Sequence, residues 1–200
     1  MRVHTKFVAA TALAAGLTGC SIGGLLGGGK APTTLVTLTP EIGEPAQIVR
    51  TATAGQAVTI EVPTTGRELS TVRVPVQVNP SDVQYVANLQ LVDTPGRLFA
   101  SLLSETIRRT TGRVVLDPQQ TSLDPGLTVN GTLQRFGYDA ATGQVIVQYD
   151  GALSVAGGNR VETRRFTATA PADGTAATVG PALNHAANQV AQQVAQWIRG

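Results

Sequence analysis

Alternating apolar and polar residues between positions 127 and 169 constrain this chain most, because they require successive strands of a β-sheet. In the clearest run, an apolar residue or glycine occupies every second position from Val145 to Val155. A period of two residues is typical of a strand with one buried face. A similar run begins at Leu127 and a third strand is expected over 161–169, with turn residues at 139–143 and 157–159. The sequence therefore predicts an antiparallel meander of three strands.

Shorter strands are expected before this meander. Five segments have strand character: residues 35–39, 58–62, 72–78, 83–91 and 113–116. In the segment 83–91 the odd-numbered positions are apolar, which predicts that they share one buried face. Pro75 cannot donate a ladder hydrogen bond, so the strand around it is expected at a sheet edge or with a bulge. As an edge, residues 74–78 would be a candidate contact for a partner that adds a strand.

Two amphipathic helices are also expected. The first begins after Thr94, a capping residue, has Pro95 at its first position and ends at Gly112. The last helix follows a linker at 171–179 and has asparagine and glutamine opposite an apolar stripe. The stripe consists of Leu183, Ala187, Val190, Val194 and Trp197. The predicted fold is α/β of the α+β kind, with an antiparallel or mixed β-sheet and two main helices packed on one face.

The N-terminal segment has the three parts of a bacterial export signal. Arg2 and Lys6 give it positive charge, an apolar run follows at 7–17, and Leu-Thr-Gly-Cys occupies positions 17–20. The run is about half the length that crosses a bilayer, which disfavours a transmembrane helix. Leu-Thr-Gly-Cys resembles the lipobox of bacterial lipoproteins. The resemblance implies cleavage before Cys20, S-diacylglycerol on its thiol and an N-acyl chain such as palmitate on its new amino terminus. A secreted protein with a free cysteine is the alternative.

These features divide the chain into a removed signal peptide (1–19), a lipidated cysteine with a flexible glycine-rich tether (20–34) and one periplasmic domain (35–200). Ser21 follows the cysteine where enterobacterial lipoproteins kept at the inner membrane have Asp, so an outer-membrane anchor facing the periplasm is expected. Removal of Arg2 and Lys6 lowers the 15 basic residues to 13, equal to the 13 acidic residues. The near-zero charge gives no reason to expect nucleic-acid binding.

The sequence predicts no enzyme, cofactor or metal site. His185 is the single histidine of the expected domain, where a surface or packing role is more common than catalysis. No cysteine and histidine cluster has zinc spacing, and no serine has a G-x-S-x-G setting. Residues 24–30 match the start of a phosphate-binding loop, but Ala31 replaces its hydroxyl residue. The arginines at 160, 164 and 165 are interpreted as the solvated face of a strand, with an acidic partner or lipid headgroups as the alternative.

The order of elements is similar to that of the auxiliary lipoproteins of ABC-type transport systems, of the paraquat-inducible protein C type. The similar pieces are the lipobox, the strands at 35–39 and 72–78, Tyr85 and its strand, the Pro95-led helix, Leu133-Gln134-Arg135-Phe136, the strand to Val155, Arg165-Phe166 before Pro171, and the last helix with Trp197-Ile198. Members commonly carry a tryptophan between the tyrosine and the first helix, whereas residues 86–94 have none. That difference weakens any transfer of surface contacts there.

The resemblance implies a non-catalytic docking component of a system that contains an MCE-domain protein and often an ABC permease and ATPase. Such systems are implied to move lipids or other hydrophobic molecules across the envelope. The lipoprotein is implied to dock against the MCE assembly at the outer membrane, sometimes as a homo-oligomeric ring, while ATP is hydrolysed by another subunit. A stand-alone periplasmic lipid-binding or carrier lipoprotein, with an apolar groove between sheet and helices, is the alternative function.

Overall fold

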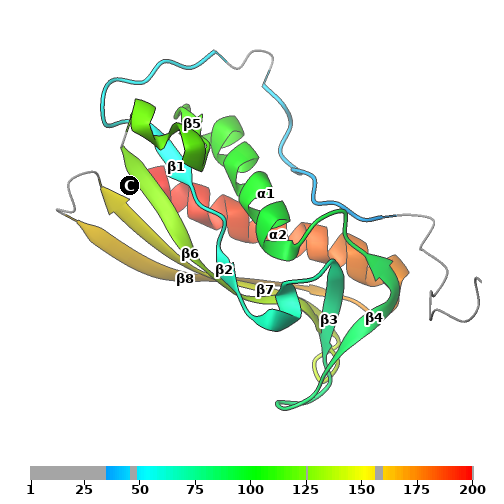
Figure 1. The fold of residues 1–200 in the computed structure, drawn as a ribbon. Coiled ribbons are helices and arrows are strands. Elements are labelled where there is room, and N and C mark those ends of the chain that lie inside the picture. The colour runs from blue at the N-terminus through cyan, green and yellow to red at the C-terminus, as the bar shows by residue number, and fades with distance from the viewer. Residues whose placement is uncertain (1–34, 46–48, 125, 156–159, 200) are drawn as a thin grey trace, which may run out of the picture. The chain divides into compact units, whose positions relative to one another are not determined.

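The computed structural model describes residues 35–199 except 46–48, 125 and 156–159 (Figure 1). The strands of its eight-stranded mixed sheet are β1 (Val58–Ile60), β2 (Thr64–Thr65), β3 (Arg73–Gln77), β4 (Val83–Gln90), β5 (Val115–Leu116), β6 (Leu127–Asp139), β7 (Gln144–Val155) and β8 (Val161–Pro171). The helices are α1 (Pro95–Thr110), α2 (Ala176–Arg199) and two short 3-10 helices, η2 (Arg67–Leu69) and η3 (Pro118–Leu123). The predicted α/β class, with a mixed sheet and two main helices, is confirmed. The predicted signal peptide, Cys20 and tether lie outside the described residues.

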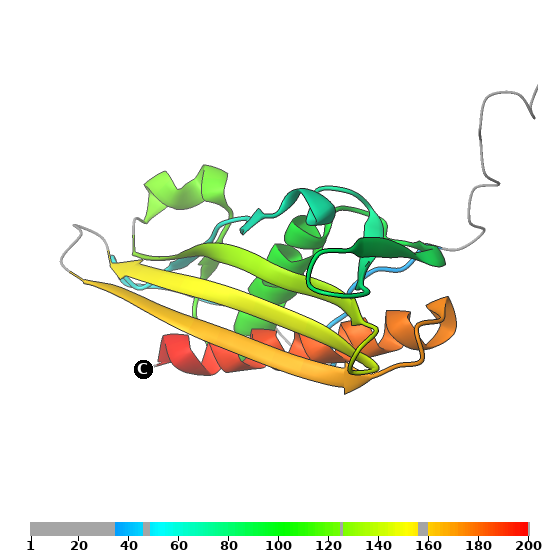
Figure 2. The same ribbon diagram turned by 90° about the horizontal axis from the view of Figure 1, so that it is seen from below.

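Strands β6, β7 and β8 form the antiparallel meander that the alternation predicted (Figure 2). On β7, residues 145, 147, 149 and 151 are buried and the residues between them are half-buried, as expected for one covered face. A register shift between Leu133 and Arg135 interrupts β6. The extra residue of such a bulge reverses the alternation, so Leu133 and Phe136 are both buried.

The parallel part of the sheet is more deeply buried than the sequence suggested. β1 lies between β5 and β6 and pairs in parallel with both. Thr59, expected on the exposed side of a half-buried strand, is only 1% exposed. β1 also contacts both α1 and η3. Parallel strands covered on both faces lose the alternation between buried and exposed positions, which explains the difference.

The prediction that β3 lies at a sheet edge is wrong. Val76 and Gln77 pair with β4 on one side and with β6 on the other, where Val76 lies opposite Tyr138. The alternative prediction, a bulge at Pro75, is confirmed by a register shift between Arg73 and Pro75. Because its last residues are paired on both sides, β3 offers no free edge there, and the idea of strand addition at 74–78 is abandoned.

The alternation expected in β4 is broken at Asn88. This residue has φ +57°, in the left-handed region that asparagine tolerates better than most residues. Val86, Leu89 and Leu91 are buried, whereas Val83 is 42% exposed, so the odd-numbered positions do not share one face. A residue in a non-extended conformation changes which side chains face the core on either side of it.

Residues 35–39 do not form the predicted strand. A single parallel bridge joins Val36 to Leu91, with hydrogen bonds from Val36 to Gln90 and from Val92 to Val36. The rest of this segment is fastened by side chains of α2, as described below. The apolar residues Val36 and Leu38 still pack against the core, which explains the strand-like pattern in the sequence.

Both helices pack on the same face of the meander, and a row of four buried aromatic rings joins them. Ring centroids are 5.1 Å apart for Phe99 on α1 and Tyr149 on β7, 6.5 Å for Tyr149 and Phe166 on β8, and 5.4 Å for Phe166 and Trp197 on α2. The predicted apolar stripe of α2 is buried throughout. No helix of the described residues combines the length and apolarity that crossing a membrane requires.

The helix boundaries agree with the sequence signals in most respects. Thr94 occupies the N-cap of α1 in extended conformation, although its side chain makes no capping hydrogen bond. Gly112 follows the helix with φ +54°, as expected of a terminating glycine. α2 begins at Ala176, inside the segment predicted as a linker, and contains Pro181 in its second turn.

Candidate functional site

A groove of about 750 Å³ opens at the end of the meander where α2 stops. Along β7 and β8 the helix-facing side chains continue past the aromatic row, where Leu153 is half-buried and Val155 is exposed. The apolar residues that line this opening are Leu127, Leu153, Val155, Phe166, Trp197 and Ile198. The volume lies within the range of about 300–1,000 Å³ that is typical of small-molecule sites. The groove is therefore the leading candidate for a binding site in the described domain.

Arginines dominate the polar part of the groove. Five contribute to the lining: Arg113, Arg160, Arg164, Arg165 and Arg199. Glu162 is the one carboxylate among the described lining residues. Its carboxylate accepts hydrogen bonds from Trp197 Nε1 at 2.6 Å and from Arg160 at 2.7 Å. These contacts, first that of Trp197 and then that of Arg160, lower the pKa of Glu162. The carboxylate therefore stays ionised, and its hydrogen-bond partners are Trp197 and Arg160.

The five arginines differ in their partners. Arg165 holds Asp150 through two hydrogen bonds of 2.6 and 2.7 Å, which lower the pKa of that carboxyl. Among the described residues, the Arg113 side chain donates only to the backbone carbonyls of Gln56 and Ile198. The guanidinium of Arg164 lies 5.5 Å from the ring centroid of Phe166. Neither Arg164 nor Arg199 forms an ion pair with any described residue, although Arg164 is close enough to Glu162 for its charge to help lower the pKa of that carboxyl.

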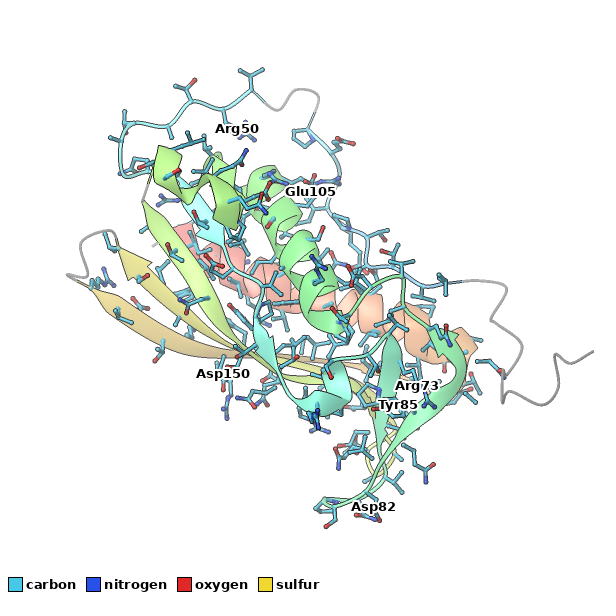
Figure 3. All side chains as sticks on the ribbon, in the orientation of Figure 1. Arg50, Arg73, Asp82, Tyr85, Glu105 and Asp150 are labelled. Carbon is cyan, nitrogen blue, oxygen red and sulfur yellow. The ribbon has the colours of Figure 1, made fainter. Side chains whose placement is uncertain are left out.

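Arg160, Arg164 and Arg165 are all exposed, as the interpretation of a solvated strand predicts, but they do not share one face. Positions 164 and 166 of β8 share the helix-facing side of the sheet, which directs Arg164 to the groove beside Phe166. Arg165 borders the groove, but its guanidinium points to the opposite side of the sheet, where it meets Asp150 of β7, labelled in Figure 3. The alternation of β8 was the available signal for this division. Arg113 and Arg199, which are distant in sequence, were missed because only the fold brings them to this opening.

A second polar cluster fastens the segment at 39–41 to α2. Asn184 Oδ1 accepts from the amide of Thr39 at 2.8 Å, and Asn188 Oδ1 accepts from the amide of Glu41 at 2.9 Å. Asn188 Nδ2 donates to Thr39 O at 2.9 Å. His185 lies 3.1 Å from Glu41 on an exposed surface, which agrees with the surface role expected for it. This arrangement holds a chain segment and presents no nucleophile.

Other polar residues have structural partners. Tyr149 donates its hydroxyl proton to Asn130 O at 2.7 Å, and burial raises its pKa. Glu105 on α1 is bound first by Arg109 and then by Arg108, which lower its pKa. On β3 and β4, the Arg73 guanidinium lies 4.1 Å from the ring centroid of Tyr85 (Figure 3). The described residues contain no group of three or more His, Cys, Asp or Glu side chains placed to hold a metal.

Two solved structures share this fold, and a third is less similar. A protein of Xanthomonas campestris, assigned to the family model DUF330, superimposes with a TM-score of 0.64 at 18% identity over 84% of this chain and 93% of that chain. An uncharacterized protein superimposes with a TM-score of 0.55 at 15% identity, covering 76% of this chain and 94% of that one. The PelC dodecamer of Paraburkholderia phytofirmans gives 0.42 at 13% identity, covering 70% and 84%. No curated protein matches the sequence.

A family model provides the assignment that these distant structures do not. The model for the ABC-type transport auxiliary lipoprotein component matches residues 37–195. The match spans β1 to β8, α1 and nearly all of α2. The chain therefore belongs to the family of ABC-type transport auxiliary lipoprotein components.

Proposed function

We propose that this protein is a non-catalytic docking component of an MCE-linked ABC-type system that moves lipids or other hydrophobic molecules across the cell envelope. The family match over residues 37–195 carries the proposal, because it covers the whole sheet and both main helices. The MCE-domain protein and the ABC permease and ATPase are its proposed partners. ATP binding and hydrolysis belong to the ATPase, and this chain supplies a surface against which the assembly docks.

The proposed attachment is through acylated Cys20 to the outer membrane, with the domain facing the periplasm. Two or three acyl chains exceed the marginal affinity of a single chain and would anchor the protein stably. The lipobox at 17–20 and Ser21 at the next position support this placement. A homo-oligomeric ring is part of the proposal, since several copies would present a repeated docking surface to an MCE assembly.

Affinity purification from cross-linked envelopes tests the partner assignment. A peptide tag inserted at the β3–β4 turn, beside Asp82 at its exposed tip (Figure 3), leaves the groove and α2 untouched. Recovery of an MCE-domain protein together with a permease and ATPase is the expected result. Recovery of lipid without these proteins would favour the stand-alone carrier. Recovery of neither lipid nor these proteins would contradict the transport role. A second tag position at the C-terminus checks that the tag itself does not block docking.

The anchor has a separate test. Metabolic labelling with palmitate should mark the full chain and not its Cys20→Ala variant. Density separation of membranes should place the labelled protein with the outer membrane, and Ser21→Asp should move it to the inner membrane in an enterobacterial host. A label that persists in Cys20→Ala would contradict the lipobox assignment.

A further inference from the structure

The groove at the end of α2 has two chemically different sides. Leu153 and Val155 of β7 and Leu127 of β6 form an apolar side that is partly exposed, with Val155 37% exposed. Exposed apolar side chains gathered in a concave site are typical of places that receive an apolar ligand. The other side carries the arginines, so the opening combines apolar contact with positive charge.

The positive charge of the groove is only partly balanced by the residues that the structure describes. Glu162 is hydrogen-bonded to Trp197 and Arg160, and it interacts with Arg164 only through charge, without an ion-pair contact. Arg113 and Arg199 form no ion pair with a described carboxylate, so the arginines of the groove outnumber its described carboxylate. Arginine presents several N–H donors in a planar fork that suits carboxylate and phosphate oxygens. The positively charged groove therefore suits a negatively charged ligand.

We propose that this groove binds an anionic lipid, with its negative head group at Arg164 and Arg199 and part of one acyl chain along Leu153 and Val155. An acyl chain has no hydrogen-bonding groups, so it can lie against these side chains without leaving a polar group unsatisfied. An acidic peptide would satisfy the arginines but would place backbone amides against the same apolar side. The site goes beyond the docking role proposed above, which requires no bound lipid.

Trp197 provides a direct reporter of occupancy. It is the only tryptophan of the chain, it lines the groove and its side chain is 8% exposed. Bromine atoms on an acyl chain quench tryptophan fluorescence on close contact, so quenching would report a chain inside the groove. Residues 32–200 form one compact unit that contains every buried core residue of the described chain, and this unit can be tested without the acyl anchor.

The experiment titrates purified residues 32–200 with chain-brominated lysophosphatidylglycerol, below the concentration at which it forms micelles. The same brominated chain on zwitterionic lysophosphatidylcholine is the matched probe, and dibromostearate distinguishes a carboxylate from a phosphate head group. We expect saturable quenching by the anionic lipids and binding at least about tenfold weaker for the zwitterionic lipid, since about 1.4 kcal/mol of charge-assisted contact corresponds to a factor of ten.

Variants separate the two sides of the groove. Arg164→Gln combined with Arg199→Gln should weaken anionic lipid binding at least about tenfold and leave the zwitterionic lipid unaffected. Leu153→Asn should weaken both lipids. Arg97→Gln, on an exposed arginine of α1 that lies 3.8 Å from Asp93, is the matched control and should change neither. Cooperative thermal unfolding of each variant confirms that it is folded.

Three outcomes would overturn the proposal. The first is the absence of saturable quenching in the unmodified domain. The second is equal affinity for the anionic and zwitterionic lipids, and the third is an unchanged affinity of the double arginine variant for the anionic lipid. Displacement of the anionic lipid by an acidic peptide at equal concentration would also overturn it, in favour of a peptide site. Because this assay contains no other protein, its failure is distinguishable from failure to recover an MCE partner from envelopes.

Discussion

Replacing Asn188 by alanine should loosen the attachment of the segment at 39–41 to α2, where the contacts of Asn184 and His185 remain, and leave the sheet intact. The Asn188 side chain is 1% exposed and joins three backbone positions. Its Oδ1 accepts from the amide of Glu41, and its Nδ2 donates to the carbonyls of Thr39 and Asn184, each at 2.9 Å. Alanine can make none of these bonds, so the variant removes both contacts between Asn188 and the segment.

The expected loss is about 2 kcal/mol in the free energy of unfolding, because a net hydrogen bond contributes about 0.5–1.5 kcal/mol. The two contacts with Thr39 and Glu41 account for most of this. Both of these residues are exposed, so water can reach the freed backbone groups and limit the cost. For a domain of this size the melting temperature should fall by about 4–8 °C.

Hydrogen exchange distinguishes this local effect from general destabilisation. The amide of Glu41 should lose its protection in Asn188→Ala, because its acceptor is removed, while amides of the β7–β8 ladder exchange as before under native conditions. Urea unfolding measures the free energy. Gln192→Ala is the matched control. The side-chain amide of Gln192 lies one turn further along α2 and makes no hydrogen bond to the described residues, so this variant should change the free energy of unfolding little.

The reasoning is refuted by either of two results. One is a destabilisation below about 0.5 kcal/mol, which would mean that water replaces the Asn188 contacts at no net cost. The other is a Glu41 amide that remains protected in the variant, which would mean that another acceptor holds the segment.

Three further changes test the packing and charge of the meander. Gly151→Ala should destabilise the domain by about 1–3 kcal/mol in urea unfolding, because its new Cβ would lie 2.9 Å from Cε1 of Tyr149 in a close-packed aromatic row. Tyr149→Phe should cost about 1 kcal/mol in the same assay, since it removes the 2.7 Å hydrogen bond to Asn130 O. Asp150→Asn should lower stability slightly at neutral pH, and the difference should vanish in acid unfolding curves. Arg165 lowers the pKa of Asp150 in the folded state, so the pair stabilises above the unfolded pKa and the effect is lost as pH falls through the folded pKa. The side chains of Arg165 and Asp150 are 62% and 31% exposed, so solvent and salt keep the effect small.

Periodicity predicted the local structure well wherever one face of an element is covered. Strand β7 alternates because helices cover one side of the meander, and the stripe of α2 is buried because it packs on that side. Periodicity failed where neighbours in space changed the environment. Thr59 is buried because α1 and η3 both pack against β1, and Asn88 shifts the phase of β4 by its left-handed conformation.

The polar side of α2 shows the same limit. Asparagine opposite an apolar stripe predicts a solvated face, but Asn188 is buried against a segment more than 140 residues earlier in the chain. A side-chain amide can pair with both an N–H and a C=O, so it serves equally well as a surface residue or as a partner for a backbone segment. Helical spacing alone does not distinguish the two.

The sequence by itself determined the meander, the two amphipathic helices and the lipobox pattern, because each depends on residues close together in the chain. Only the tertiary structure decided that β3 is paired on both sides and that the last turn of α2 meets the ends of the meander strands at one groove. That packing brings Arg113, Arg164 and Arg199 to one opening. Their separation in sequence leaves no local pattern, because their proximity arises from long-range packing.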